Sequence, residues 1–361
     1  MTAERFEGNL ADSGFVMPAE WQPHACTWVA WPHNTDTWSK NLDAAQREFI
    51  SLVKTIAIDE PVVVAIPNDR QADIFNRRLL ECEIKPALDI WTIRMNTNDA
   101  WIRDYGPTFV ARNDRLAAVD WKYNAWGGKY PPFDDDQKVA RRCLNLMPPF
   151  ASNDNPVLFK TSELCIEGGA LEIDAGGAMM CTKSCAMDQN RNPDWTLDQI
   201  EYELRGCLGG KQIIWLDGDA IAGDDTDGHI DQLARFVPGH KIVYAWTNDL
   251  DDPQRQNLQS NLDQLRQALS QFGMGYQLVP LPLPQPIHFH NLRLPASYCN
   301  FYITNRSVVV PQFDQPKSDQ QALEILISLF PDRNVVGLPS VNLIAGLGSF
   351  HCLTQQQPAV L

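Results

Sequence analysis

Near its C-terminus the chain reads Leu347-Gly-Ser-Phe-His-Cys-Leu-Thr-Gln-Gln-Gln-Pro358. Gly346 and Gly348 give this stretch a loop-like start, and residues 350–354 are typical of a short strand that ends before the proline. Cys352 therefore stands at the junction of a glycine-containing loop and a strand, where loop N–H groups can point at whatever the thiol attacks. A buried cysteine without chemistry is the commoner outcome for this residue type. The rest of the chain has to supply partners for the thiol.

The overall composition is that of a soluble globular chain. With 361 residues, 44% of them hydrophobic and 21% charged, it is long enough for one large domain or two smaller ones. No run of about 18 apolar residues could span a bilayer, and the opening MTAERFEGNL lacks the apolar core of a secretory signal. We therefore expect a cytoplasmic protein without a membrane partner. Nine cysteines, an odd number without framework spacing, also indicate a reducing compartment.

The charge balance is acidic. Thirty lysines and arginines stand against 45 aspartates and glutamates, for a formal net charge of -15. Such a surface repels nucleic acid and anionic lipid, and it weakly favours a small cationic ligand. Cys181 and Cys185 have no second pair or histidine cluster at zinc spacing, so we expect no metal and no other cofactor. A homo-oligomer is compatible with the sequence, which does not reveal the oligomeric state.

One pattern recurs along the chain, namely a polar signature, a strand, a turn and a second strand, usually with a helix after them. The signatures contain Asp104, Glu167, His229, Ser297 and Cys352, at intervals of 55 to 68 residues. Each unit places polar residues at the same end of a strand. We therefore expect an α/β repeat that closes around an axis, with these strand ends meeting in one central cleft.

The predicted elements follow from hydrophobic periodicity and turn residues. The opening reads strand–helix–strand–helix, at residues 26–31, 43–58, 61–66 and 69–80. The later strand pairs are predicted at 108–111 with 116–121, 232–237 with 241–246, and 300–303 with 307–310, and a further pair lies within 165–180. Helices are predicted at 137–146, 253–272 and 319–329, with helix-like residues before 208.

His229 and Asp231 are two residues apart at the start of a predicted strand, so their side chains should lie on the same face. His351 is adjacent to the cysteine and would point to the opposite face of its strand. This leaves His229 as the candidate base for the thiol. Taken alone, a His-x-Asp pair is a weak signal, because an ordinary hydrogen-bonded pair is the commoner case.

Asp104 and Glu167 add two carboxylates at strand ends, although Asp104 could simply pair with Arg103. A cysteine–histidine enzyme that acts on neutral amides needs only one acid, to orient its histidine. Several acids around a thiol suit a substrate that itself carries a delocalised positive charge. A guanidinium group fits, because it is planar and its fork of N–H donors pairs with carboxylates in bidentate fashion.

The chemistry would then run through the sulfur. Two carboxylates on the guanidinium nitrogens would place its carbon over Cys352. Thiolate attack would give a tetrahedral species, ammonia would leave after protonation by His229, and an amidino-cysteine would remain. Water activated by the same histidine would release a ureido product. Nearby acids disfavour a thiolate, so we expect the bound cation or a protonated His229 to favour it.

An ordered set of motifs resembles the agmatine deiminases and the related bacterial peptidyl-arginine deiminases, thiol enzymes of the pentein superfamily. The motifs are Glu20-Trp-Gln-Pro-His24, Trp28-Val-Ala-Trp-Pro32, Asp99-Ala-Trp-Ile-Arg-Asp-Tyr-Gly-Pro107, Glu167-Gly-Gly169, Asn190-Arg-Asn-Pro193, Asp225-Thr-Asp-Gly-His-Ile-Asp231 and Phe350-His-Cys-Leu-Thr-Gln-Gln-Gln-Pro358. Each motif is modest, but their order over nearly the whole chain is specific. The resemblance implies a single domain over residues 1–361, in which about residues 1–12 form a short N-terminal extension. The implied fold is a five-bladed pentein α/β-propeller with pseudo-fivefold repeat around a central active-site cleft.

The resemblance also implies roles for the site residues. Cys352 would be the nucleophile, His229 the acid/base, and Asp104 and Asp231 the guanidinium ligands. The expected substrate-binding residues are Glu167 as a further acid, Trp101 as a channel wall, Gly348 in the loop, and Asp225 and Asp227 for a far amine.

The glycine run before the cysteine departs from the family pattern, because Ala345-Gly-Leu-Gly-Ser349 stands where consecutive glycines are usual. Leu347 does not readily adopt a positive φ, so we expect the backbone of this loop to be affected.

The expected activity is hydrolysis of agmatine to N-carbamoylputrescine and ammonia, a step towards putrescine. An arginine or peptidyl-arginine deiminase is the alternative enzyme, and it would need a basic partner for the substrate carboxylate. An inactive cation- or polyamine-binding protein of the same fold is the alternative from another class. A papain-like protease is disfavoured, because there the cysteine precedes the histidine.

Overall fold

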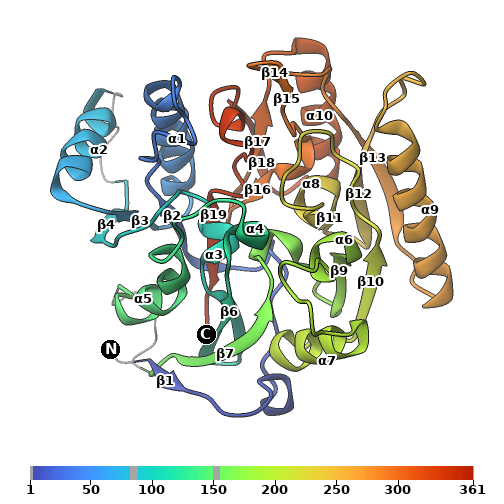
Figure 1. Ribbon diagram of the computed structural model, residues 1–361, viewed down its shortest axis with the longest axis horizontal. Coiled ribbons are helices and arrows are strands. Elements are labelled where there is room, and N and C mark those ends of the chain that lie inside the picture. Colours follow the sequence, from blue (N-terminus) through green and yellow to red (C-terminus); the bar gives the residue numbers. More distant parts are fainter. Residues whose placement is uncertain (1–2, 82–87, 149–154, 361) are drawn as a thin grey trace.

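The computed structural model describes residues 3–81, 88–148 and 155–360. Short sheets occupy its interior, and the longer helices lie around the periphery (Figure 1). The peripheral helices are α1 (Leu42–Ala57), α2 (Asp69–Glu81), α5 (Val139–Asn145), α7 (Leu197–Leu208), α9 (Arg255–Gln271) and α10 (Pro316–Leu329). The chain is thus a mixed α/β protein, and the α/β class predicted from the sequence is confirmed.

Four stretches of the chain share one arrangement, in which two antiparallel strands are followed by a helix and by a third strand parallel to the second. The first stretch consists of β5 (Thr108–Arg112), β6 (Arg115–Lys122), α5 and β7 (Leu158–Cys165). The second consists of β8 (Glu172–Ile173), β9 (Ala178–Thr182), α7 and β10 (Gln212–Leu216). The third consists of β11 (Ala234–Val237), β12 (Lys241–Trp246), α9 and β13 (Gln277–Pro282). The fourth consists of β16 (Tyr302–Ile303), β17 (Ser307–Gln312), α10 and β18 (Asn334–Pro339).

A further sheet joins segments from the two ends of the described chain. Its strand order is β19-β2-β3-β4, with β19 (Thr354–Pro358) antiparallel to β2 (His24–Ala30), and β3 (Val62–Ile66) and β4 (Ile90–Arg94) added in parallel. Every residue of β3 is buried, as expected for a sheet covered on both faces. The apolar stripe predicted on α1 is also buried, at Phe49, Leu52, Val53 and Ile56.

The remaining elements are short. They are β1 (Glu4–Arg5), η1 (Ala11–Ser13), α4 (Ala125–Gly128), η2 (Asp136–Lys138), α6 (Lys183–Ala186), β14 (His288–Phe289), β15 (Leu292–Arg293) and η6 (Ile344–Gly346). Strand β1 pairs in parallel with β7, so part of the predicted N-terminal extension packs against the first of the four stretches. None of the helices in the described ranges has the length and apolar character needed to cross a membrane.

A single helical turn precedes the first strand in each of the four stretches. These turns are α3 (Ile102–Tyr105), η4 (Gly168–Ala170), α8 (Ile230–Leu233) and η5 (Tyr298–Asn300). They contact one another in that order. The turn at residues 350–353 joins them, because the His351 N–H donates to the Asn300 carbonyl and the Arg103 N–H donates to the Cys352 carbonyl. Five polar turns therefore lie together.

These turns correct two details of the sequence prediction. Cys352 was expected inside a strand from 350 to 354, but it lies in a turn and β19 begins only at Thr354. His229 was expected at the start of a strand, but it is the N-cap of α8, and β11 begins at Ala234. Backbone N–H groups in these turns are not used in a sheet, so they can donate to side chains. The side chains of residues in a turn also point in other directions than they would in a strand.

The third strand of each of the four stretches was not predicted from the sequence. These strands are β7, β10, β13 and β18. Strand β13 contains Pro280 and Pro282, and β18 ends at Pro339. Prolines are tolerated there because both strands lie at a sheet edge. Both strands are also only partly buried, so they lack the clear apolar alternation that marks a strand in a sequence.

The sheet that joins the two ends depends on Trp28. Its side chain is fully buried in β2, and its Nε1 donates to Gln357 Oε1 at 2.9 Å in the neighbouring strand β19. We expect Trp28→Ala to lower the free energy of unfolding by about 3–5 kcal/mol, because a large buried side chain and a cross-strand hydrogen bond are lost. Urea unfolding measures this. Ile327→Ala, at a residue of α10 that is 53% exposed, is the control and should change it by about 0.5 kcal/mol or less. Equal losses in the two variants would contradict this account.

Candidate active site

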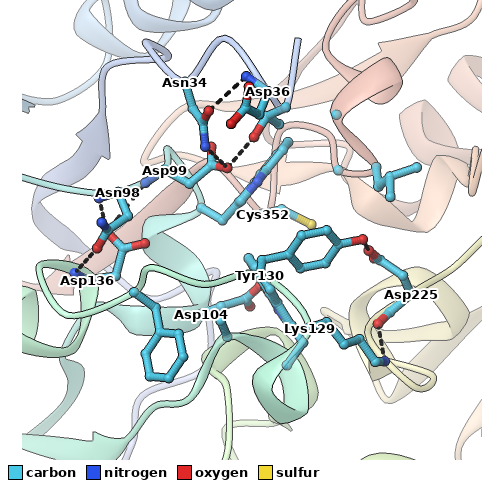
Figure 2. Close-up of a pocket in the computed structure, with 18 of the residues that line it drawn as sticks. Asn34, Asp36, Asn98, Asp99, Asp104, Lys129, Tyr130, Asp136, Asp225 and Cys352 are labelled. Atoms are coloured by element: carbon cyan, nitrogen blue, oxygen red, sulfur yellow. Dashed lines mark hydrogen bonds between the residues drawn. The ribbon is translucent and has the colours of Figure 1, made fainter. Parts of the chain in front are cut away.

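A cavity of about 710 Å³ lies beside the five polar turns, and both Cys352 and Asp104 line it. Its other acidic lining residues are Asp36, Asp99, Asp136 and Asp225. Figure 2 shows Cys352 between Asp225 on one side and Asp99 and Asp136 on the other. A concave site that holds a nucleophilic side chain and several carboxylates is the natural place to look for chemistry.

Cys352 is held in place by the neighbouring turn. Asn300 Nδ2 lies 3.2 Å from its Sγ, and Asp231 Oδ2 lies 3.6 Å from the same sulfur. The thiol is 5% exposed, through the cavity. Burial raises its pKa well above the usual value, the charges of Asp231 and Asp104 add to this, and Asn300 opposes it in part. These surroundings favour the neutral thiol over the thiolate.

His229 lies beside these residues, and it is almost completely buried. Its Nε2 is 3.4 Å from Glu167 Oε2, and its Nδ1 is 3.6 Å from Asp104 Oδ1. Burial disfavours the imidazolium, but Asp104, Cys185 and Glu167 raise the pKa of His229 well above its ordinary value. The Nδ1 atom has no hydrogen-bond partner within the described residues. A charged imidazole with one free N–H can give a proton to a leaving group.

The convergence of these side chains depends on Gly169. A Cβ at this position would lie 2.6 Å from Asp104 Oδ1, 2.7 Å from His229 Nδ1 and 3.2 Å from Asp231 Oδ2. Any side chain here would displace the functional groups, so the second glycine of the Glu-Gly-Gly motif provides space.

Asp104 and Asp231 differ in what holds them. Asp104 accepts hydrogen bonds from Trp126 Nε1 and from the Gly169 N–H, each at 3.0 Å. Burial raises the pKa of Asp104 to about 6, His229 opposes this rise, and the charges of Asp231 and Glu167 add to it. The excess of negative charge makes this group ready to receive a cation.

Asp231 presents one oxygen to the protein and keeps the other free. Its Oδ2 receives His351 Nδ1 at 2.7 Å and Asn300 Nδ2 at 3.2 Å. Its Oδ1 is buried and has no partner within the described residues. Burial alone would raise the pKa of Asp231, but the hydrogen bond and charge of His351 bring it below its ordinary value. An ionised oxygen without a donor can accept an N–H group from a ligand.

Glu167 lies behind His229, and neither of them lines the cavity, which is also true of Asp231. Arg191 Nε donates to both of its oxygens, at 2.9 and 3.1 Å. Burial would raise the pKa of Glu167, but Arg191 and His229 bring it down to about 2. Cys185, Glu167 and His229 place ligand atoms within 4.8 Å of one another, a spacing that could hold a metal ion. The arginine already pairs with that carboxylate, so this arrangement fits an ion-pair network better than a cation site.

Trp101 and the loop before the cysteine form one wall of the cavity. Trp101 contacts Trp38, with ring centroids 5.2 Å apart. A Cβ on Gly348 would lie 2.5 Å from Cζ3 of Trp101, so a glycine is needed for the ring to approach. Leu347 was expected to resist a positive φ, yet it adopts φ 73° after η6. Its side chain packs against the buried cluster that contains Ile344, and this contact offsets a backbone cost of about 1–2 kcal/mol.

Asp225 and Asp227 occupy different positions. Asp225 lines the cavity, and its carboxylate accepts a hydrogen bond from the hydroxyl of Tyr130 (Figure 2). Asp227 does not line the cavity, and its Oδ2 lies 2.6 Å from both Arg191 Nη1 and Lys129 Nζ. Because two cations already share the Asp227 carboxylate, only Asp225 is placed to meet a ligand cation.

The residues that contact the site and were not predicted from the sequence include Asn300, Arg191, Lys129 and Trp126. Asn300 follows the Ala-Ser-Tyr signature from which Ser297 was chosen. The Ser297 hydroxyl instead donates to the Gln232 carbonyl and accepts the Cys299 N–H, so it stabilises the turn. The available signal for Asn300 was its position as the last polar residue before β16. Arg191 lay in the Asn-Arg-Asn-Pro motif without a role.

Comparisons with known proteins agree over nearly the whole chain. Residues 16–358 match the family model described as Porphyromonas-type peptidyl-arginine deiminase. An agmatine deiminase of Stutzerimonas stutzeri is 35% identical over 372 aligned residues, with 96% of each chain covered. An agmatine deiminase of Pseudomonas syringae pv. tomato is 36% identical with the same coverage. The solved structure of an agmatine deiminase of Enterococcus faecalis has a TM-score of 0.89 and 30% identity, covering 99% of this chain and 100% of that one.

The charges around Cys352 predict how its thiol reacts with a neutral alkylating agent. Because its pKa is raised, little thiolate exists at pH 7, and labelling by iodoacetamide should speed up about tenfold per unit as pH rises from 7 to 9.5. Asp231→Asn removes the nearest negative charge, so labelling at a given pH should be faster. Mass spectrometry of the Cys352 peptide measures both rates, and the other described cysteines, which do not line the cavity, are internal references. Fast labelling at pH 7 without a rise would contradict the assigned electrostatics.

Proposed function

The chain belongs to the Porphyromonas-type peptidyl-arginine deiminase family, and we propose that it hydrolyses agmatine to N-carbamoylputrescine and ammonia. The observation that carries the proposal is the buried, ionised and unpartnered oxygen of Asp231 beside the thiol of Cys352, with a second carboxylate, Asp104, across Gly169. Two such acceptors around a sulfur suit the N–H fork of a guanidinium carbon better than they suit a neutral amide.

Binding would place the guanidinium between Asp104 and Asp231, with its carbon facing Cys352. Two bidentate carboxylates fix the plane of the group and hold the carbon near attack distance. The bound positive charge also offsets the acids that raise the pKa of the thiol, so the thiolate forms when substrate is present. The free nucleophile is thereby kept unreactive until a cation arrives.

The reaction follows from this arrangement. The thiolate adds to the guanidinium carbon, and one nitrogen of the tetrahedral species takes a proton from His229 and leaves as ammonia. The carbon stays bound to Cys352 as an amidino-cysteine. His229, now neutral, removes a proton from a water that adds to the same carbon, and collapse releases the ureido product and regenerates the thiolate. Glu167, fixed by Arg191, supports the imidazolium form of His229.

The lining of the cavity favours agmatine over arginine. Among the lining residues, Lys129 and His33 are the basic ones, and both are engaged. Lys129 Nζ contacts the Asp227 carboxylate and the Asp225 carbonyl, and the His33 nitrogens lie at 2.9 and 3.0 Å from backbone carbonyls. A substrate carboxylate would find no free base there and would meet several acids. A substrate with a second positive charge would meet Asp225, which we propose as the partner of its amine.

Three further statements complete the proposal. We propose that the four ββαβ stretches and the sheet β19-β2-β3-β4 are the blades of a five-bladed pentein propeller around the active site. The chain would act as one domain. Its product, N-carbamoylputrescine, would place the reaction in putrescine and polyamine metabolism. The pairing of strands within each sheet and the contacts between the polar turns support the repeat.

Paired assays with agmatine and arginine test the function directly. We expect ammonia release from agmatine, with kcat/KM at least about 100-fold above that for arginine, because arginine would bring an unpaired carboxylate into the acidic cavity. Cys352→Ala should lose at least about 1,000-fold in kcat and still bind agmatine in calorimetry. Turnover of arginine or of an arginyl peptide in place of agmatine would support the alternative deiminase. No turnover of any of these substrates, with tight agmatine binding, would support the binding-protein alternative.

The role of Asp225 can be isolated by comparing two substrates. We expect Asp225→Asn to raise KM for agmatine about tenfold, because a buried ammonium loses its charged partner. Butylguanidine has the same guanidinium and carbon chain without the amine, so its kinetics should change by about twofold or less. Ammonia release from each substrate by each protein measures both effects. An equal loss for the two substrates would show that Asp225 acts on the guanidinium end or on the structure.

A further inference from the structure

The N-terminal motif Glu20-Trp-Gln-Pro-His24 has no place in the mechanism above, although Glu20 is buried close to the site. Its Oε2 lies 2.8 Å from His351 Nε2 and 2.7 Å from Arg235 Nη2, and its Oε1 accepts the Ile303 N–H at 2.8 Å. One carboxylate thus binds groups from two of the four stretches and from the closing turn. A buried glutamate needs fewer contacts than these to satisfy its hydrogen-bonding groups.

The His351 imidazole continues this chain of contacts to Asp231. Its Nδ1 lies 2.7 Å from Asp231 Oδ2, on the side opposite the Nε2 contact with Glu20. Both contacts are hydrogen bonds when each ring nitrogen carries a proton, as in the imidazolium. The charges then alternate along the series Arg235, Glu20, His351, Asp231. This arrangement allows four ionised groups to be buried together.

The position of His351 determines which oxygen of Asp231 is available. Asn300 Nδ2 donates to the same Oδ2, so both protein donors use one oxygen and leave Oδ1 without a partner. The amide of Asn300 also contacts the Cys352 sulfur and accepts the His351 and Cys352 N–H groups. Without His351 the carboxylate could rotate, and either oxygen could turn to Asn300 or to the thiol.

We propose that His351, anchored by Glu20, is a positioning residue that fixes the Asp231 carboxylate so that one oxygen faces the guanidinium. The proposal rests on the guanidinium chemistry proposed for this site. His351 lies next to the nucleophile in sequence, yet its side chain turns away from the cavity and acts through Asp231. The Glu20 motif, far away in the sequence, thereby completes the active site.

The physical consequence of losing His351 is a change in the charge of Asp231. The groups that face Asp231 are His351, Cys352, His229, Arg235 and Asp104. Burial raises the pKa of Asp231, and His351 is the main group that opposes this. In His351→Gln the pKa of the Asp231 carboxyl should therefore rise, so that the carboxyl keeps its proton to higher pH. Its attraction for a cation would be weak near pH 6 and would recover at higher pH.

The alkylation rates of two reagents report on the charge of Asp231. Chloroacetamidine is a cation and chloroacetamide is its neutral analogue, and both can alkylate Cys352. We expect the ratio of their rates to fall about tenfold or more in His351→Gln and by a smaller factor in Glu20→Gln. The ratio in His351→Gln should recover between pH 6 and pH 9. Mass spectrometry of the Cys352 peptide gives both rates in the full-length protein.

Asp319→Asn is the matched control for loss of a buried carboxylate. Asp319 accepts the Phe313 and Gln315 N–H groups and the Tyr298 hydroxyl and contacts neither Asp231 nor Cys352, so its loss should lower stability and leave the rate ratio within about twofold. Agmatine kinetics provide a second measurement. We expect His351→Gln and Glu20→Gln each to raise KM by a larger factor than they lower kcat. Should His351→Gln fail to fold, Glu20→Gln carries the test.

Unchanged rate ratios and pH profiles in folded His351→Gln and Glu20→Gln would overturn the positioning role and leave a purely structural network. Failure of the proposed function would look different, because the wild-type protein would then release no ammonia from agmatine. The rate ratio does not depend on turnover, so the two outcomes remain distinguishable.

Discussion

The antiparallel pairing of β19 with β2 is the constraint on which the site depends. Cys352 lies two residues before β19, and Glu20 lies four residues before β2. The register that pairs Thr354 with Val29 therefore determines the positions of both residues. A slip of one residue would turn every side chain of β19 to the other face. Trp28 and Gln357 secure that register through a side-chain hydrogen bond across the two strands.

The second constraint is charge. Asp104, Glu167, Asp231 and Glu20 are all buried around one sulfur, and burial of so many carboxylates is stable only with matching cations. Arg191 compensates Glu167, and Arg235 and His351 compensate Glu20 and Asp231. Asp104 is the least compensated, and its pKa, raised to about 6, reflects that deficit. His229, whose Nδ1 lies 3.6 Å from Asp104 Oδ1, offsets this rise only in part.

The sequence predicted much of the fold, because amphipathic helices and hairpin turns leave local patterns. The strand at Lys241–Trp246 was predicted with its observed bounds, and the helices of the later units came within a few residues of theirs. Two of the third strands, β13 and β18, were missed because proline-containing edge strands show little alternation. Leu347 was misjudged because tertiary packing, which a local rule cannot see, overrides the preference of a leucine for negative φ.

The residue types of the candidate site could be predicted from the sequence, but the contacts between their side chains were harder to predict. Residue types and spacing identified the cysteine, the histidine and the acids, since their chemistry depends on type. Partners such as Arg191 and Asn300, and the space left by Gly169, depend on side chains that come from different units and meet only after folding. Asp227 was expected to bind a far amine, because its pairing with Arg191 and Lys129 could not be inferred from one chain segment.

The pairing of β2 with β19 also has a consequence for the order of folding. Cys26 and Gln357 lie opposite each other across this sheet but are 331 residues apart in the chain. During synthesis β2 emerges early and must wait, with one edge unpaired, until β19 has left the ribosome. Contacts of such long range form slowly. Cys352 and strand β19 are synthesised together, so an incomplete chain has an open sheet edge and lacks the thiol of the candidate site.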